Sequence, residues 1–260
     1  MKEWIYGRNP VNETILAGRR QVFRLRVARE SITHPRLDRL TQYAASRNIP
    51  VDPVPREQLD PLADHHQGVA VQVSSYPYSS LANILSVADD RGEPPLVLLL
   101  DTLQDPQNLG TLLRTAEIVG VQGILLPKRH SASVTPAVVN ASSGATEHLL
   151  IAQTNLAQAI NRLKRAGLWV IGLESGSQAQ SPDELNLDGP LGLVIGSEGK
   201  GMRPLVRRSC DLLMRLPMRG KIDSLNAAVA GSIALYLVWQ ARGYSGSDDA
   251  KETIDEPGKS

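Results

Sequence analysis

The chain has 260 residues, 42% of them hydrophobic, and a formal net charge of +1, so it can bury one large core or two smaller ones. Its single cysteine, Cys210, excludes an internal disulfide and a cysteine-cluster metal site. The N-terminal sequence lacks the apolar segment of a signal peptide, and no apolar run approaches the roughly 20 residues that span a bilayer. We therefore expect a cytoplasmic protein.

Positive charge is concentrated at the start of the chain. The first 50 residues hold ten basic and four acidic side chains, and all but one of the basic ones are arginine. The planar guanidinium group suits phosphates and base edges. The segment predicts an RNA or DNA footprint, with Arg8, Arg24 and Arg26 as candidate RNA-binding residues. The alternative is a solvated basic face.

Residues 1–74 predict a small α/β domain. Asn9 and Pro10 are typical of a helix start, with Asn9 as the cap. Apolar residues then alternate with Arg24 and Arg26, which predicts a half-buried strand with the arginines facing outward. The remaining elements are expected to be a helix over 35–46, a short strand at Val51, a helix over 56–63 and a closing strand over 68–73.

Two adjacent histidines, His65 and His66, do not predict a metal site, because neighbours on an extended chain point to opposite sides. Residues 75–95 are rich in serine and proline and predict a linker that carries one short helix over about 80–89.

From residue 96 the pattern changes to strands that alternate with helices. This order predicts a mainly parallel sheet with helices on both faces, in a domain over 96–243. The expected strands are 96–101, 123–126, 147–151, 168–173, 191–195 and 212–216, and the expected helices are 109–119, 135–142, 156–166 and one from 224. Ligands bind such sheets at the carboxyl ends of the strands, so residues 105–108, Arg114 and residues 196–201 should lie near one rim.

The glycine-rich segment 196–201 follows the strand over 191–195. It fails the P-loop pattern because Gly201 follows Lys200, and it fails the dinucleotide-binding pattern because Pro204 stands where the third glycine belongs. Asp223 or Ser224 is placed to cap the long C-terminal helix. The combination predicts a site made mainly of backbone.

Three motifs occur in order over residues 96–242: LDTLQDPQNLGTLLRTA with Asn108 and Arg114, IGSEGKG with Glu198, and LPMRGKIDSLNAAVA with Asn226. They resemble the signature motifs of the SpoU (TrmH-like) RNA ribose 2′-O-methyltransferases of the SPOUT superfamily. The segments YGRNPV and HQGVA are similar to the ribosomal-protein L30e-like substrate-binding domain of the bacterial 23S rRNA guanosine-2′-O-methyltransferase branch.

The resemblance implies an α/β fold with a trefoil knot and S-adenosylmethionine bound in the knot by backbone groups. It implies cofactor-binding residues at Gly196, Ser197, Gly199, Leu216, Met218 and Leu225. The implied catalytic residues are Arg114, Asn108, Glu198, Asn226 and Ser224.

In this resemblance Arg114 acts on the ribose hydroxyl, either as the proton acceptor or by orienting the ribose. The first role is chemically demanding because the pKa of arginine is above about 12. Asn108 and Asn226 are expected to hold the arginine and the ribose in place.

The C-terminal helix is apolar nearly all round, which predicts burial on all sides and, in this family, a homodimer. The polar, acidic segment 244–260 is expected to be disordered. Two other functions remain open: a tRNA ribose 2′-O-methyltransferase, and a non-catalytic RNA-binding factor of ribosome assembly on the same fold.

Overall fold

The structure is a computed structural model that describes residues 2–32, 34–128, 132–222 and 224–247. It forms two compact units, which are considered separately: the first ends at Ser75, and the second spans Tyr76–Gly243. Residues 244–247 group with the first unit. None of the helices in these ranges is long and apolar enough to cross a membrane.

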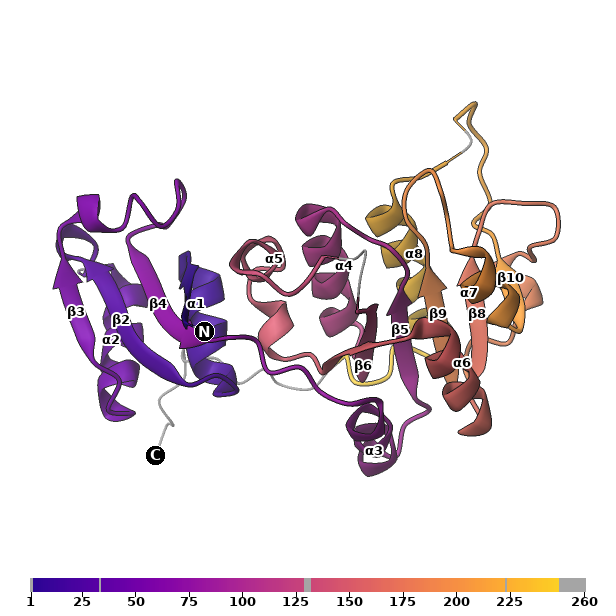
Figure 1. Ribbon diagram of the computed structural model, residues 1–260, viewed down its shortest axis with the longest axis horizontal. Helices are drawn as coiled ribbons and strands as arrows, with labels where there is room; N and C mark the ends of the chain where they lie inside the picture. The colour runs from indigo at the N-terminus through magenta and orange to yellow at the C-terminus, as the bar shows by residue number, and fades with distance from the viewer. Residues whose placement is uncertain (1, 33, 129–131, 223, 248–260) are drawn as a thin grey trace. The chain divides into compact units, whose positions relative to one another are not determined.

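The first unit is a four-stranded sheet in the order β1-β4-β2-β3 (Figure 1). β4 pairs antiparallel with β1 and β2, whereas β2 and β3 are parallel. The strands are β1 (Lys2–Tyr6), β2 (Val22–Ala28), β3 (Val51–Val54) and β4 (Val69–Ser74), and the helices are α1 (Arg8–Ala17) and α2 (Pro35–Ser46). In β2, Leu25 and Val27 are fully buried, so the predicted alternation is confirmed for the apolar side chains.

Two local predictions in this unit are wrong. Helix α1 begins at Arg8 behind Gly7, which makes no side-chain cap, so Asn9 is a helical residue and not the cap. The helix expected over 56–63 is reduced to the short 3₁₀ helix η2 (Arg56–Gln58). Pro61 supplies no N–H for a longer helix, which explains the early end.

The segment expected to be a linker packs on the second unit. Its helix α3 (Leu81–Arg91) places Leu81 and Ile84 in the hydrophobic core of that unit. The Tyr76 hydroxyl donates to the backbone oxygens of Thr146 and Leu149, at 3.0 and 2.7 Å. These contacts make the segment part of the second unit's structure.

The second unit contains a six-stranded sheet in the order β10-β8-β9-β5-β6-β7. Every pairing between neighbours is parallel, which confirms the predicted sheet type. The strands are β5 (Leu96–Leu100), β6 (Gly123–Pro127), β7 (Ile151–Thr154), β8 (Trp169–Leu173), β9 (Leu191–Ile195) and β10 (Leu212–Met214). β5 and β9 are buried at every position, as expected for strands covered on both faces.

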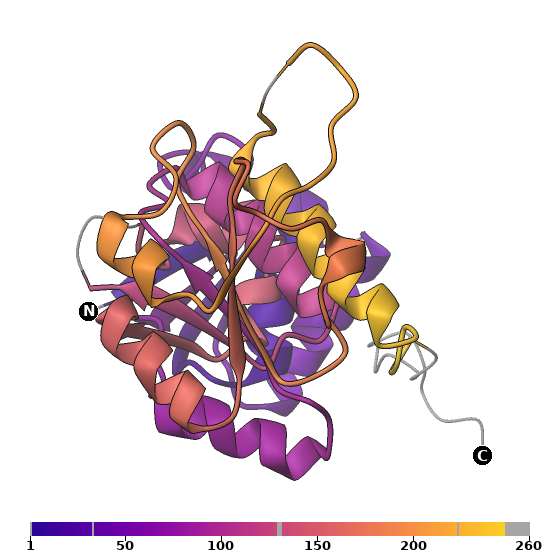
Figure 2. The same ribbon diagram turned by 90° about the vertical axis from the view of Figure 1, so that its right-hand side faces the viewer.

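Helices cover both faces of this sheet (Figures 1 and 2). Helix α4 (Pro106–Ile118) packs against α5 (Pro136–Ala141) and against α8 (Ala227–Ala241) on one face. The other face carries α3, α6 (Leu156–Arg165) and α7 (Pro204–Ser209), whose apolar residues share one core cluster.

The starts of β7 and of α8 differ from prediction in this unit. Glu147 lies in a 3₁₀ turn whose N–H groups bond to nearby carbonyls, so β7 starts only at Ile151. Helix α8 begins at Ala227 with Asn226 as its cap, in place of Ser224. Asp223, the other predicted cap, and residues 248–260 of the predicted tail lie outside the described residues, while residues 244–247 form turns.

Candidate active site

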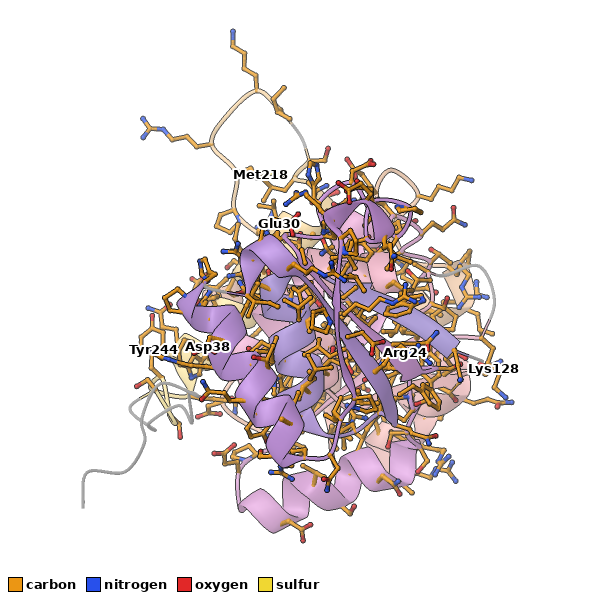
Figure 3. The ribbon with its side chains drawn as sticks, turned by 90° about the vertical axis from the view of Figure 1, so that its left-hand side faces the viewer. Arg24, Glu30, Asp38, Lys128, Met218 and Tyr244 are labelled. Atoms are coloured by element: carbon orange, nitrogen blue, oxygen red, sulfur yellow. The ribbon has the colours of Figure 1, made fainter. Side chains whose placement is uncertain are left out.

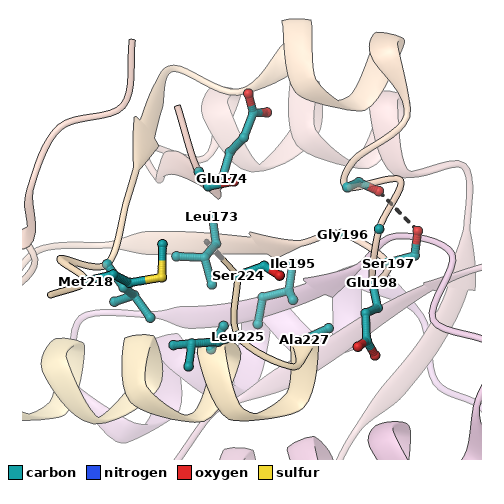
Figure 4. A pocket seen from close by; sticks show the side chains of 15 residues that line it. Leu173, Glu174, Ile195, Gly196, Ser197, Glu198, Met218, Ser224, Leu225 and Ala227 are labelled. Atoms are coloured by element: carbon teal, nitrogen blue, oxygen red, sulfur yellow. Dashed lines mark hydrogen bonds between the residues drawn. The ribbon is translucent and has the colours of Figure 1, made fainter. Parts of the chain in front are cut away.

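A cavity of about 370 Å³ opens at the carboxyl ends of β8 and β9 (Figure 4). Three stretches of chain line it, and they lie far apart in sequence. The lining residues are Leu173, Glu174, Ser175, Ile195, Gly196, Ser197, Glu198, Gly199, Gly201, Leu216, Met218, Ser224, Leu225, Ala227 and Ala230. All six residues predicted to bind a cofactor are among them, together with Glu198 and Ser224.

The wall after β9 is a tight backbone turn. Ser197 and Gly201 exchange two backbone hydrogen bonds, at 3.1 and 2.9 Å. Gly199 and Gly201 adopt φ angles of +77° and +64°, which glycine takes without strain. At Gly196 a Cβ atom would meet the backbone of Gly201 and Met202, so any side chain there would displace the turn.

The remaining walls divide into an apolar and a polar part. Figure 4 shows Leu173, Met218 and Leu225 on one side of the cavity and Ser197 and Glu198 on the other. An apolar slot with a few polar groups is typical of a small-molecule site.

Among the described residues that line the cavity, the charged ones are the carboxylates Glu174 and Glu198. Arg207 Nε donates to both Glu174 oxygens, at 2.9 and 2.8 Å, and this hydrogen bonding raises the pKa of Arg207. Because Arg207 is paired with Glu174, Glu198 is the carboxylate that favours a ligand with positive charge and disfavours a polyphosphate.

Asn226 connects the cavity to α4. Its Oδ1 accepts hydrogen bonds from the N–H groups of Ala228 and Val229, at 2.9 and 3.2 Å, and so caps α8. Its Nδ2 donates to Asn108 Oδ1 at 3.0 Å and to Glu198 Oε2 at 3.3 Å. The structure therefore brings one residue from each of the three motifs into a single hydrogen-bonded group.

Arg114 lies on α4, on the same helix as Asn108. It is exposed, and its Nη1 donates to Ser143 Oγ at 3.2 Å. Ser143 follows α5 in a turn with a φ of +55°. The predicted catalytic arginine is therefore held by a residue outside the three motifs and not by the Asn108–Asn226–Glu198 group.

The three predicted RNA-binding arginines do not share one surface. Arg24 lies 3.6 Å from the Asp52 carboxylate, and the Arg26 guanidinium stacks over the Trp4 ring at 4.7 Å. Arg26 lies on the same face of β2 as Arg24, opposite to the buried Leu25 and Val27, but it is only partly exposed. Arg8 lines a separate cavity beside the start of α1.

Sequence reasoning missed the support behind the site. Asp101 is fully buried at the end of β5 and accepts hydrogen bonds from the Arg203 backbone N–H and Nε, both at 2.7 Å. An aspartate that ends an apolar strand signals a buried ionic contact, but the sequence does not show which arginine provides it. Ser143 likewise carries no motif that would single it out.

Residues 95–236 match the model of the SpoU rRNA Methylase family, which is more than half of the chain. The chain belongs to the SpoU (TrmH) family of RNA methyltransferases. S-adenosylmethionine is the cofactor of this family. Residues 4–79 match a second model, described as RNA 2′-O ribose methyltransferase substrate binding.

Relatives of this SpoU family chain span nearly its whole length. A Bacillus subtilis protein named "Putative TrmH family tRNA/rRNA methyltransferase YacO" is 41% identical over 92% of this chain and 96% of that protein. The fold is similar to that of the SpoU methyltransferase AviRb from Streptomyces viridochromogenes, solved in complex with AdoMet, with a TM-score of 0.77 at 22% identity over 94% of this chain and 91% of that one. An AdoMet-bound rRNA methyltransferase from Sinorhizobium meliloti gives a TM-score of 0.74 at 24% identity, over 94% and 88% of the two chains.

Proposed function

We propose that this SpoU family protein transfers a methyl group from S-adenosylmethionine to a ribose 2′-hydroxyl of RNA, at a guanosine of 23S rRNA. The observation that carries the proposal is the convergence of Asn108, Glu198 and Asn226 at a cavity with a glycine turn and two carboxylates. Two structural neighbours were solved with AdoMet bound, which supports the choice of cofactor.

The residues present suit this cofactor. The apolar side chains Leu216, Met218 and Leu225 would hold the adenine, and Gly196 leaves the backbone close enough to read its edge. The carboxylate of Glu198 would balance the positive charge of the ligand. We also propose that this part of the chain forms the trefoil knot of the family, which would place the glycine turn beside residues 216–225.

When bound, S-adenosylmethionine supplies a methyl carbon on a sulfonium, which is open to attack by an oxygen nucleophile. The protein must align the ribose oxygen with that carbon and accommodate the loss of the hydroxyl proton. Because Asn226 Oδ1 is used in the α8 cap, its Nδ2 must face Asn108 and Glu198. This orientation leaves the Nδ2 group of Asn108 as a donor for a ribose oxygen.

Arg114 is assigned to orienting the ribose or its phosphate. A guanidinium stays protonated at neutral pH and is a poor proton acceptor. Arg114 is exposed, and its hydrogen bond to Ser143 uses one N–H group of the guanidinium. The other N–H groups can donate to the substrate. Ser224 is exposed and lines the cavity just before α8, which suits a contact with the substrate.

Residues 1–74 are assigned to binding RNA and residues 96–243 to methyl transfer. The match of residues 4–79 to a substrate-binding model supports this division and favours the 2′-hydroxyl as the acceptor. Arg8 is the candidate RNA contact in the first unit, because Arg24 and Arg26, which the sequence also predicts to bind RNA, are engaged by Asp52 and Trp4.

A homodimer is also part of the proposal. Helix α8 and the residues before it expose Leu225, Val229, Ile233 and Tyr236 by 40 to 45%. A row of large apolar side chains beside the cavity suits burial by a second copy. Sedimentation at micromolar concentration should give a dimer that Val229→Glu weakens, and a monomeric wild type would contradict this part.

The function is tested by transfer of a tritiated methyl group to undermethylated 23S rRNA, 16S rRNA and tRNA. We expect label in 23S rRNA, located at a ribose oxygen because the product resists alkaline hydrolysis, and its loss in Arg114→Ala. Relatives are named for tRNA and rRNA together, so label in tRNA alone would support a tRNA ribose 2′-O-methyltransferase. If the protein binds RNA but does not bind S-adenosylmethionine, the result would support a non-catalytic factor of ribosome assembly.

A further inference from the structure

Three arginines of the first unit converge on one cavity of about 470 Å³. Arg8 comes from α1, Arg36 from α2 and Arg56 from η2, and Asn9 and Gln67 complete the lining. None of the described residues that line it carries a carboxylate. A cavity with three positive charges and no negative one favours an anion.

Neutral groups hold two of these arginines in place. Arg8 donates from its backbone N–H to Gln67 Oε1 at 2.9 Å and from Nε to the Gln67 carbonyl at 3.3 Å. Arg36 Nη1 donates to Asn9 Oδ1 at 3.1 Å. Gln67 itself has a φ of +54°, an uncommon conformation for a residue other than glycine. The contacts orient the guanidinium groups without neutralising them.

The start of α1 adds to the positive potential. This helix of ten residues has no side-chain cap at Gly7, and Asn9 of its first turn lines the cavity. N–H groups at a helix start attract anions. Here that effect adds to three guanidinium groups, which can bind phosphate oxygens in pairs.

The β2 arginines have different surroundings. Arg24 is paired with Asp52, and Arg26 stacks on Trp4. Figure 3 shows Arg24 on the opposite side of this unit from Asp38, which lies on the same helix as Arg36. Arg24 therefore offers a matched control: an exposed arginine of the same unit outside the cavity.

We infer that the cavity formed by Arg8, Arg36 and Arg56 is a binding site for backbone phosphate of the RNA substrate. The inference rests on the proposed function for the identity of the RNA, and it assigns phosphate binding to this cavity and not to the β2 face. Phosphate contacts position an RNA without reading its sequence.

The test uses the full-length protein with Arg36→Gln, Arg56→Gln, both together, and Arg24→Gln as the control. Binding to transcribed 23S rRNA is measured by filter retention at several salt concentrations. Each cavity variant should weaken binding about tenfold and reduce the slope of log K against log salt by about 0.7 to 0.9. Arg24→Gln should stay within about twofold of wild type.

Methyl transfer separates this inference from the proposed function. In the double variant KM for RNA should rise while kcat and the affinity for S-adenosylmethionine stay unchanged. If the wild type methylates 23S rRNA and the cavity variants keep their salt slope and KM, the cavity inference alone is overturned. A wild type that methylates no RNA defeats the proposed function, while the salt slopes still decide the cavity.

Two further outcomes would overturn the inference. An equal loss in Arg24→Gln would indicate a diffuse basic face. Calorimetric binding of inorganic phosphate that the double variant loses, with unchanged RNA slopes, would indicate a site for free phosphate.

Discussion

Asn226 donates from its side-chain amide to Asn108 Oδ1 at 3.0 Å, although 118 residues separate the two in the chain. The same amide group caps α8 with its oxygen. One side chain thus joins the start of a helix to the polar group beside the cavity, and the two roles use different atoms.

The variant Asn226→Asp should separate these roles. Aspartate caps a helix as well as asparagine does, so the unfolding midpoint should stay close to wild type. The Nδ2 donors to Asn108 and Glu198 are lost, and methyl transfer should fall about ten- to hundredfold because the ribose is misplaced. Asn226→Ala, which also removes the cap, should cost about 1 kcal/mol of stability in addition. Full activity in Asn226→Asp would contradict the role of this group.

Ser143 occupies a position where glycine is usual. The N–H groups of Ser143 and Gly144 bond back to the carbonyls of Asn140 and Val139, a common way to end a helix that places the first residue after the cap at positive φ. A serine there is strained by about 1 kcal/mol. Its hydroxyl accepts a hydrogen bond from Arg114, so we expect that the strained serine is retained because it positions this arginine.

Ser143→Gly should therefore raise stability by about 1 kcal/mol and lower kcat. Ser143→Asn, which tolerates positive φ and keeps an acceptor oxygen, should restore part of the activity. In an Arg114→Ala background the Ser143→Gly change should have no further effect on kcat, since the two residues act together. Urea unfolding and single-turnover methyl transfer measure both quantities. Independent effects in the double variant would show that Ser143 does not act through Arg114.

Gly196→Ala should disrupt the cavity while leaving the sheet intact. The added methyl group would meet the backbone of Gly201 and Met202, so the turn must move. We expect calorimetry to show that S-adenosylmethionine binds at least about tenfold more weakly to this variant. A tenfold loss of affinity corresponds to about 1.4 kcal/mol of binding free energy. Gly220→Ala is the control, because a methyl group at Gly220 meets nothing within 4 Å. Equal affinities in the two variants would place the cofactor elsewhere.

Cys210 should be unreactive in the native protein. Burial, with the nearby charge of Asp211, raises the pKa of the Cys210 thiol to about 12. Its Sγ donates to the Val206 carbonyl at 3.4 Å. Because the thiolate is the reactive form, a thiol reagent at pH 8 should label the protein only after denaturation. Rapid labelling of the folded protein would contradict this pKa.

The same shift makes stability depend on pH. The folded-state pKa lies above the unfolded value of about 8.5 to 9, so the contribution of Cys210 is fully present below pH 8.5 and is lost as the pH rises toward 12. The loss should be at most about 1.4 kcal/mol per pH unit. Cys210→Ser cannot ionise in this range, and the difference between its urea midpoints and those of wild type from pH 8 to 10.5 isolates the effect.

Local signals in the sequence predicted much of the second unit. The apolar runs of β5 and β9 are continuous because both strands are buried on both faces. A continuous apolar run is visible in the sequence itself, so it predicts the positions of these strands. Helix caps were harder to assign. Asp223, Ser224 and Asn226 are all residue types that cap helices well. The contacts that distinguish Asn226 come from Asn108, 118 positions earlier, and from Glu198, 28 positions earlier.

The arginine cavity shows a second limit of sequence reasoning. Arg8, Arg36 and Arg56 lie on three elements, and a count of charges along the chain cannot distinguish them from Arg24, which has a carboxylate partner. Which arginine is neutralised depends on strand register: Arg26 pairs with Asp52 across the two strands, which brings that carboxylate within reach of Arg24. Register follows from the folded sheet and not from local pattern.

The ion pair of Asp101 and Arg203 has a consequence for the order of folding. Asp101 is fully buried, and its partner lies 102 residues later in the chain. A carboxylate buried without its partner is strongly destabilising, so the end of β5 cannot reach its native surroundings until the segment after the glycine turn arrives. During synthesis, we therefore expect β5 to complete its native contacts only after the segment that contains Arg203 has been made. The cavity at the carboxyl ends of β8 and β9, one wall of which is the turn that ends at Gly201, should form in the same step that completes the sheet's core.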